Sequence, residues 1–187
     1  QSARASPARV LCLLALVTAV VSALLDNVTT VLLIAPVTLS IAQRLRLPPF
    51  PFLFAEVMAS NIGGTATLIG DPPNIMIGSA AALSFNAFIF HLLPVVIIVM
   101  AVQLMLTHFL WGRSTVTTQA ERAAVMAISA RSAIVDPRLL RLAVVVFGAT
   151  LLAFVFAGFL RLEVGTIAMM GAATLVLLDN LAHHRSE

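Results

Sequence analysis

The sequence contains no lysine, one cysteine, and few charges of either sign. Charged residues make up 10% of the 187 residues, whereas an ordinary soluble domain carries about 25%. All eleven basic residues are arginines, dispersed between apolar runs without interleaved aromatic residues, and this excludes a basic nucleic-acid-binding face. Because Cys12 has no second cysteine to pair with, a disulfide within the chain is excluded as well.

The short motifs of nucleotide-binding and catalytic sites are also missing. The glycine pair at 63–64 is not followed by Gly-Lys-Ser/Thr, and no G-x-G-x-x-G occurs. We find no nucleophile–base pair and no cluster of metal ligands at a supportive spacing. His183 and His184 are adjacent, but metal binding would need further ligands. We therefore expect no enzyme activity, no resident cofactor and no structural metal.

Hydrophobic residues, in contrast, make up 60% of the chain. A helix that crosses a bilayer needs roughly 20 apolar residues, and residues 86–112, 139–160 and 164–181 contain such runs. The segment 113–138 carries several arginines and is expected to be a connector on the cytoplasmic face. The sequence predicts an all-α integral membrane protein with transmembrane helices.

The first 85 residues form two apolar units that are polar at their centres. Residues 10–43 are interrupted by DNVTT (26–30), and are too long for one span but too short for two full spans with a turn. Residues 48–83 have the same form around SNIGGTATLIGDPPN (60–74), whose glycines permit unusual backbone angles and whose proline pair stops a helix. We expect a re-entrant helical hairpin over 10–43 and a discontinuous helix over 48–83.

Arginine placement agrees with this topology. Short cytoplasmic loops are enriched in basic residues. Arg4 and Arg9 precede the first unit, and Arg44 and Arg46 follow it, so both ends of the unit are expected on the same side. A plain hairpin of two full spans would place its ends in the same way, and only its length and its polar centre separate the two interpretations.

The two polar centres are the candidate binding site. Broken helices at membrane depth present amide ends that favour anions and carbonyl ends that favour cations. Hydroxyl and amide groups can ligate a hard cation or bond an oxyanion, and an aspartate at this depth can bind a cation or carry a proton. The candidate substrate- or ion-binding residues are Asp26, Asn27, Thr29, Thr30, Asn61, Gly63, Gly64, Thr65, Thr67, Asp71 and Asn74.

Each of these residue types also has a structural interpretation. Asp26 could cap a helix beginning near Val28, and Asp71 could form a turn before the prolines. The glycines could simply allow close helix packing. Glu56, near the start of the second unit, could lie at the membrane interface or belong to a site.

DNVTTVLLIAPVTL (26–39) and SNIGGTATLIGDPPN (60–74) resemble the ion-transporter superfamily, in particular its arsenite-efflux permease and P-protein branch, which is related to citrate carriers. The resemblance implies two inverted repeats, each with a re-entrant hairpin and a discontinuous helix. Residues 1–112 would belong to the first repeat and residues 139–187 would be the first two helices of the second. It also implies a homodimer when the protein is full length.

The function that this resemblance implies is secondary active transport of a small anion or metalloid, with arsenite as first choice, coupled to Na⁺ or protons. Sodium-coupled dicarboxylate members usually have Ser and Thr where this chain has Asp26 and Asp71, which favours protons, cations or a neutral metalloid over a dicarboxylate. The alternatives are a sodium/proton antiporter, an ion channel and a non-transporting membrane scaffold.

The expected partners are membrane lipid and a small inorganic or carboxylate ion, and the expected location is the cytoplasmic membrane of a bacterium. The chain does not begin with Met and holds only one hairpin and one broken helix. We expect it to be part of a longer protein and not to transport by itself.

Overall fold

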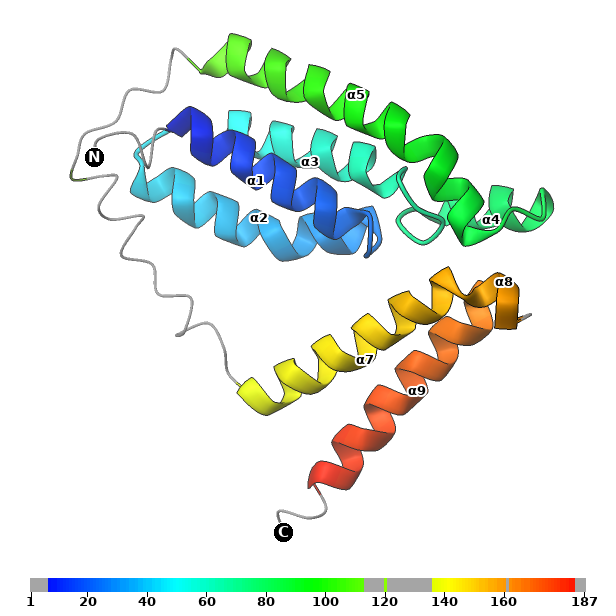
Figure 1. The fold of residues 1–187 in the computed structure, drawn as a ribbon. Coiled ribbons are helices and arrows are strands. Elements are labelled where there is room, and N and C mark those ends of the chain that lie inside the picture. The colour runs from blue at the N-terminus through cyan, green and yellow to red at the C-terminus, as the bar shows by residue number, and fades with distance from the viewer. Residues whose placement is uncertain (1–6, 113–119, 121–135, 161, 184–187) are drawn as a thin grey trace. The chain divides into compact units, whose positions relative to one another are not determined.

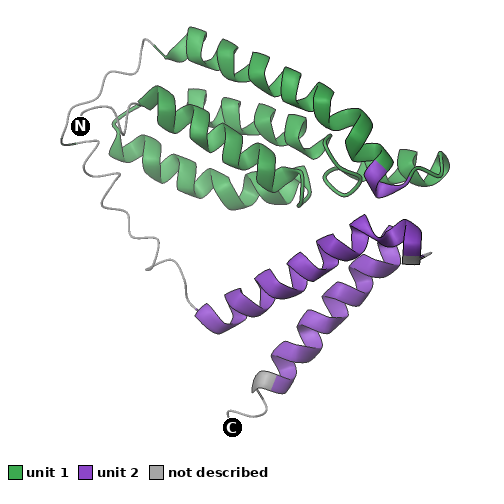
Figure 2. Cartoon of the chain, viewed as in Figure 1, with its two compact units in different colours: residues 1–83, 87–128 green, residues 84–86, 129–187 purple. Residues whose placement is uncertain are grey.

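The computed structural model describes residues 7–112, 120, 136–160 and 162–183, and in these residues it contains helices and no strand (Figure 1). The prediction of an all-α chain is therefore confirmed. The predicted connector 113–138 lies outside the described residues except for residue 120 and residues 136–138. The chain divides into two compact units, residues 1–83 with 87–128 and residues 84–86 with 129–187 (Figure 2).

The first unit is a layer of helices in which α1 and α2 both pack against α3 (Figure 1). Its elements are α1 (Pro7–Ser22), α2 (Asn27–Arg44), α3 (Phe50–Gly64), α4 (Pro72–Ala80) and most of α5 (Phe85–Trp111). The first helix ends four residues before Asp26, and the third ends at the glycine pair, so the helices are interrupted at the two polar motifs.

Small residues allow α1 and α3 to cross closely. The buried residues of α1 recur every three or four positions from Leu11 to Ser22, which is the spacing of one helix face. At the crossing, a Cβ added to Gly63 would lie 2.1 Å from the backbone oxygen of Ala19. Close approach of this kind is typical of helices packed within a membrane.

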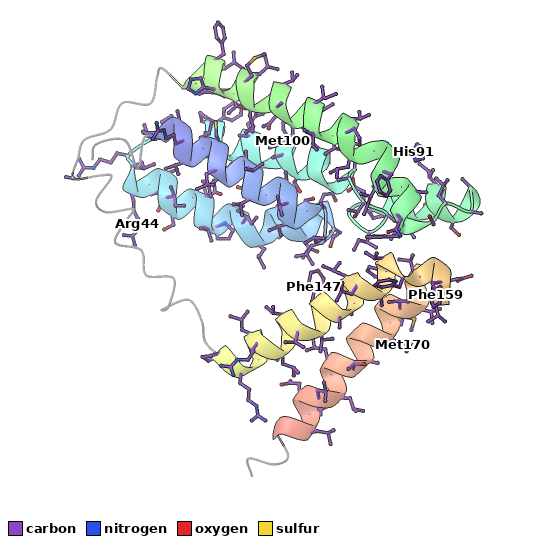
Figure 3. The ribbon with its side chains drawn as sticks, in the orientation of Figure 1. Arg44, His91, Met100, Phe147, Phe159 and Met170 are labelled. Carbon is purple, nitrogen blue, oxygen red and sulfur yellow. The ribbon has the colours of Figure 1, made fainter. Side chains whose placement is uncertain are left out.

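The α5 helix joins the same core through its second half. The Gln103 side-chain amide donates a hydrogen bond to the Ala55 carbonyl oxygen of α3 at 3.2 Å. The ring of Trp111 packs edge-on against Phe54, with 5.6 Å between the ring centroids. Met100, labelled in Figure 3, is buried in the core formed with α1 and α3.

The second unit contains α7 (Pro137–Val155), the short α8 (Ala157–Leu160) and α9 (Val164–His183). The helix expected over 139–160 is therefore shorter than predicted, because the chain turns at Phe156 before α8 begins. Within the second unit, the Asn86 side-chain amide donates to the Val155 carbonyl oxygen at 2.9 Å.

Three helices among the described residues are long and apolar enough to cross a membrane: Phe85–Trp111, Pro137–Val155 and Val164–Leu181. These helices and the adjoining α8 carry large apolar side chains on their surfaces. Examples are Phe159 of α8, which is 89% exposed, and Met170 of α9, which is 58% exposed (Figure 3). Such continuous apolar exposure suits lipid. The chain is an integral membrane protein.

Candidate functional site

The turn between α1 and α2 is fixed on the end of α3 by hydrogen bonds. The Asn27 side-chain amide donates to Asn61 Oδ1 at 3.1 Å. The Ser60 hydroxyl donates to the Asn27 carbonyl oxygen at 3.0 Å, and the Ser22 hydroxyl donates to the Ser60 carbonyl oxygen at 2.7 Å. The structure thus brings together Asn27 and Asn61, the two predicted asparagines that lie 34 residues apart.

Ser22 and Ser60 were missed by the sequence reasoning. Both are fully buried. Ser22 follows Thr18 by four residues and Ser60 follows Glu56 by four, and all four residues lie on the buried faces of their helices. Polar residues repeated at this spacing within apolar helices were the signal that could have found them.

The loop between α3 and α4 is tied to the same turn through Thr67. Its hydroxyl donates to the Ala23 carbonyl oxygen at 2.5 Å. The Thr67 hydroxyl oxygen in turn accepts hydrogen bonds from the backbone amides of Ile69 and Gly70, at 3.3 and 3.2 Å. Thr67 therefore shapes the loop and joins it to the end of α1.

Asn74 closes this loop from the first turn of α4. Its side-chain amide donates to the carbonyl oxygens of Gly64, at 3.0 Å, and Thr67, at 2.9 Å. The residue is 6% exposed. Both of its amide protons are used within the protein, so this predicted site residue positions the loop.

The glycines serve close approach and not unusual backbone angles. No glycine among the described residues has a positive φ, so that expectation was wrong. The physical reason is that the chain leaves α3 through Thr65 in an ordinary right-handed conformation, with φ −71°. Instead, Gly63 lies against Ala19, and Gly64 leaves room for a carboxylate, since an added Cβ would lie 2.9 Å from Asp71 Oδ2.

The two predicted site aspartates differ in the hydrogen bonds that their carboxylates accept. Asp26 is the N-cap of α2, where its Oδ1 accepts a hydrogen bond from the Thr29 amide at 2.9 Å. Asp71 occupies the same position before α4 but makes no capping hydrogen bond. The amide of Asn74, which corresponds to that of Thr29, donates instead to the Asp71 backbone carbonyl oxygen at 3.0 Å, and the two prolines between them have no amide proton to donate.

Asp71 is half-buried, and its carboxyl group lies against Gly64. Its Oδ1 is buried and has no hydrogen-bond partner in the part of the chain that the structure describes. Asp26 lies at the same end of α3, because it adjoins Asn27, which bonds Asn61. Two neighbouring carboxylates, one of them unpartnered, can hold a cation or a proton.

The predicted threonines are divided between the cluster and the helix core. The Thr65 hydroxyl donates to the Asn61 carbonyl oxygen at 2.7 Å, at the end of α3. The Thr29 side chain is exposed beside the Asp26 cap. Thr30 is fully buried, and its hydroxyl has no hydrogen-bond partner among the described residues.

The electrostatics of the cluster favour a cation. No basic residue occurs between Arg9 and Arg44, or between Arg46 and His91. The only charged side chains in the segments that build the cluster are therefore acidic. The carbonyl end of α3 adds partial negative charge. The amide end of α4, which would favour an anion, is weakened because its first two residues are prolines.

These features define a class of protein: an all-helical integral membrane protein with a polar cluster where its helices are interrupted. Comparison with known proteins then gives the family within this class. The chain belongs to the citrate transporter family, whose sequence profile matches residues 1–185. The resemblance to the P-protein branch is also confirmed: the human P protein is 45% identical over 107 residues, which is 54% of this chain and 13% of the P protein.

Mycobacterial relatives match nearly the whole chain. A protein of Mycobacterium tuberculosis named as an uncharacterized transporter is 48% identical over 186 residues, covering 99% of this chain and 42% of the relative. The 46 kDa membrane protein of Mycobacterium leprae is 50% identical over 177 residues, covering 94% and 41% respectively. The chain thus spans about two fifths of the length of these relatives. No solved structure gives a significant match.

Proposed function

We propose that the full-length protein is a secondary active transporter that binds a cation where the α1–α2 turn meets the end of α3, and moves a small anion or metalloid coupled to it. The observation that carries the proposal is the Asp71 carboxyl group, which lies against Gly64 and whose buried Oδ1 has no partner among the described residues. An arsenite-type oxyanion remains the first candidate for the cargo. Citrate is the carboxylate to compare with it, because the family bears that name.

The proposed site lies at mid-depth in the bilayer. The α1 and α3 helices have 16 and 15 residues. At 1.5 Å per residue they extend about 24 and 22 Å, less than the roughly 30 Å of a hydrocarbon core. Short helices that end in polar residues support a re-entrant hairpin and a discontinuous helix, as in transporters that bind their substrates at broken helices.

The proposed ion-binding groups come from both polar motifs. Asn27 and Asn61 offer amide oxygens, Asp26 and Asp71 offer carboxylates, and the end of α3 offers backbone carbonyls. The remaining site residues shape the loops that hold these groups. We propose that a second hairpin and broken helix, elsewhere in the full-length protein, complete the site, and that the protein is a homodimer of the bacterial cytoplasmic membrane.

Transport by the full-length protein in liposomes tests this proposal. Arsenite and citrate are supplied separately under imposed sodium or proton gradients. Asp71→Asn should abolish gradient-driven uptake or efflux, because the amide removes the charge that holds the cation. Glu163→Gln removes a carboxylate on an exposed residue and is the matched control. Unchanged transport by Asp71→Asn in a folded protein would show that Asp71 does not hold the coupled cation, whereas no transport by the folded wild type would leave the scaffold hypothesis standing.

A sodium/proton antiporter is the second candidate, and the presence of two aspartates, Asp26 and Asp71, in the two polar motifs favours it. Two carboxylates that share one cation or proton are suited to exchange of the two ions. An antiporter would move protons against sodium in liposomes that contain no arsenite and no citrate, whereas a cotransporter needs its cargo. Single-channel currents would instead indicate a channel.

A further inference from the structure

Glu56 is an acidic residue inside the helix core of the first unit. It lies in α3, is 1% exposed, and neither carboxyl oxygen has a hydrogen-bond partner among the described residues. Glu56 belongs to the first compact unit, in which α3 packs against α1 and α2. Most buried acidic side chains are paired or hydrogen-bonded, so this carboxyl group requires an explanation.

Its surroundings are small or neutral. The buried face of α3 that contains Glu56 also contains Phe52, Ala55, Ala59 and Ser60. The Thr38 hydroxyl of α2 lies beside the carboxyl group and close enough to interact, although without the geometry of a hydrogen bond. Thr38 is also fully buried.

No charged group compensates an ionised Glu56. The helices packed against α3 carry few titratable residues, and in the described part of the chain these are Arg9, Cys12, Arg44, His91 and His108. None of them hydrogen-bonds to the Glu56 carboxyl group, whose two oxygens have no partner among the described residues. A carboxylate buried without a partner destabilises a protein by several kcal/mol, and the neutral acid avoids most of that cost.

We propose that Glu56 is a proton-binding site separate from the α1–α2 turn, and that it carries the proton that drives transport. The inference rests on the proposed function, since it names the group that couples transport to protons. It assigns the proton to the α1–α3 core and leaves Asp26 and Asp71 to the cation and cargo.

A mechanical link between the two sites exists in α3. Glu56 lies four residues before Ser60, one helical turn away on the same buried face. The Ser60 hydroxyl donates to the carbonyl oxygen of Asn27, and its oxygen lies 3.1 Å from the hydroxyl oxygen of Ser22. Loss of the proton from Glu56 would draw water or a cation toward this face, and the hydrogen bonds that hold the α1–α2 turn are the next contacts along it.

The first experiment measures stability and needs no transport. Thermal unfolding of the full-length protein, of Glu56→Gln and of the control Glu163→Gln is followed in detergent from about pH 5 to pH 8. The folded state keeps a proton that the unfolded chain releases above about pH 4.3. Stability of the wild type should therefore fall, relative to Glu56→Gln, as the pH rises. Glu163→Gln should follow the wild type, and a pH-independent difference for Glu56→Gln would overturn the inference.

The second experiment measures coupling in liposomes. A one-unit pH gradient is imposed in either direction with labelled arsenite or citrate. It can support up to about tenfold accumulation for one coupled proton, since 1.4 kcal/mol corresponds to a factor of ten. Glu56→Gln should lose this accumulation, Glu56→Asp should recover part of it, and Glu163→Gln should keep it.

The outcomes separate the two proposals. If the wild type accumulates cargo and Glu56→Gln does so equally, or if a sodium gradient alone drives the wild type, the inference about Glu56 is wrong while the proposed function survives. If the wild type moves neither cargo under any gradient, the proposed function is wrong, and the unfolding experiment still decides whether Glu56 holds a proton.

Discussion

At the scale of single residues, the chemistry of a side chain depends on the backbone that follows it. Asp26 and Asp71 both precede a helix, but only Asp26 meets an amide proton, that of Thr29. The corresponding amide, that of Asn74, donates to the Asp71 backbone, the two prolines have none to donate, and Asp71 Oδ1 has no partner among the described residues. One local difference therefore separates a structural aspartate from one that is available to a ligand.

Gly63 is the residue whose size matters most for packing. Gly63→Ala would place a methyl group 2.1 Å from the Ala19 backbone oxygen, and backbone atoms cannot move aside as a flexible side chain can. We expect a loss of about 1–3 kcal/mol of stability, as for other overpacked sites, measured by thermal unfolding of the full-length protein.

Gly148→Ala is the control for this substitution, because no atom lies within 4 Å of its added Cβ. It lies inside α7, where alanine is preferred over glycine by up to about 1 kcal/mol. Equal melting temperatures for the two variants would contradict the proposed close crossing of α1 and α3.

At the scale of elements, the interruption between α3 and α4 is a built loop. Thr67 and Asn74 form most of its hydrogen bonds, to Ala23, Gly64 and the loop itself. A flexible linker would not need buried side chains to hold it. The loop therefore fixes the position of the Asp71 carboxyl group relative to the α1–α2 turn.

Thr67→Val tests this function of the loop. Valine has the same shape but cannot donate to Ala23 or accept from Ile69 and Gly70, and we expect a loss of about 1–3 kcal/mol because buried partners are left unsatisfied. Transport should fall together with stability. Thr174→Val is the control, since its exposed hydroxyl bonds only the Met170 carbonyl oxygen of its own helix. If the two variants lost the same amount of stability relative to the wild type, the hydrogen bonds of Thr67 would not be what stabilises the loop.

At the scale of the whole molecule, the depth of the α1–α2 turn in the bilayer distinguishes a re-entrant hairpin from a full-length hairpin. Both a re-entrant hairpin and a full-length hairpin place Arg9 and Arg44 on one side. Helix length favours the re-entrant form, because α1 has 16 residues and a span needs roughly 20.

Cysteine labelling separates the two topologies. Val28 is 64% exposed at the turn, so Val28→Cys in a Cys12→Ala background presents one reactive thiol. We expect a membrane-impermeant maleimide added outside to label it much more slowly than Leu83→Cys, because the loop before α5 carries no charged residue and is therefore expected outside. Equal labelling rates would show that the turn reaches the outer surface and that the hairpin spans the bilayer.

The sequence by itself determined that the protein is helical and membrane-embedded, and it located both interruptions. Apolar run length and the positions of glycine and proline are local properties, so they can be counted along the chain. It also gave the family, since DNVTT and SNIGGTATLIGDPPN are contiguous motifs.

Only the tertiary structure decided which polar residues meet. Asn27 bonds Asn61, Asn74 closes a loop, and Glu56 is buried without a partner. These outcomes depend on how α1, α2 and α3 pack, and packing joins residues tens of positions apart. No local pattern specifies such contacts, because the same side chain is a cap, a ligand or a buried acid according to the groups that other helices bring beside it.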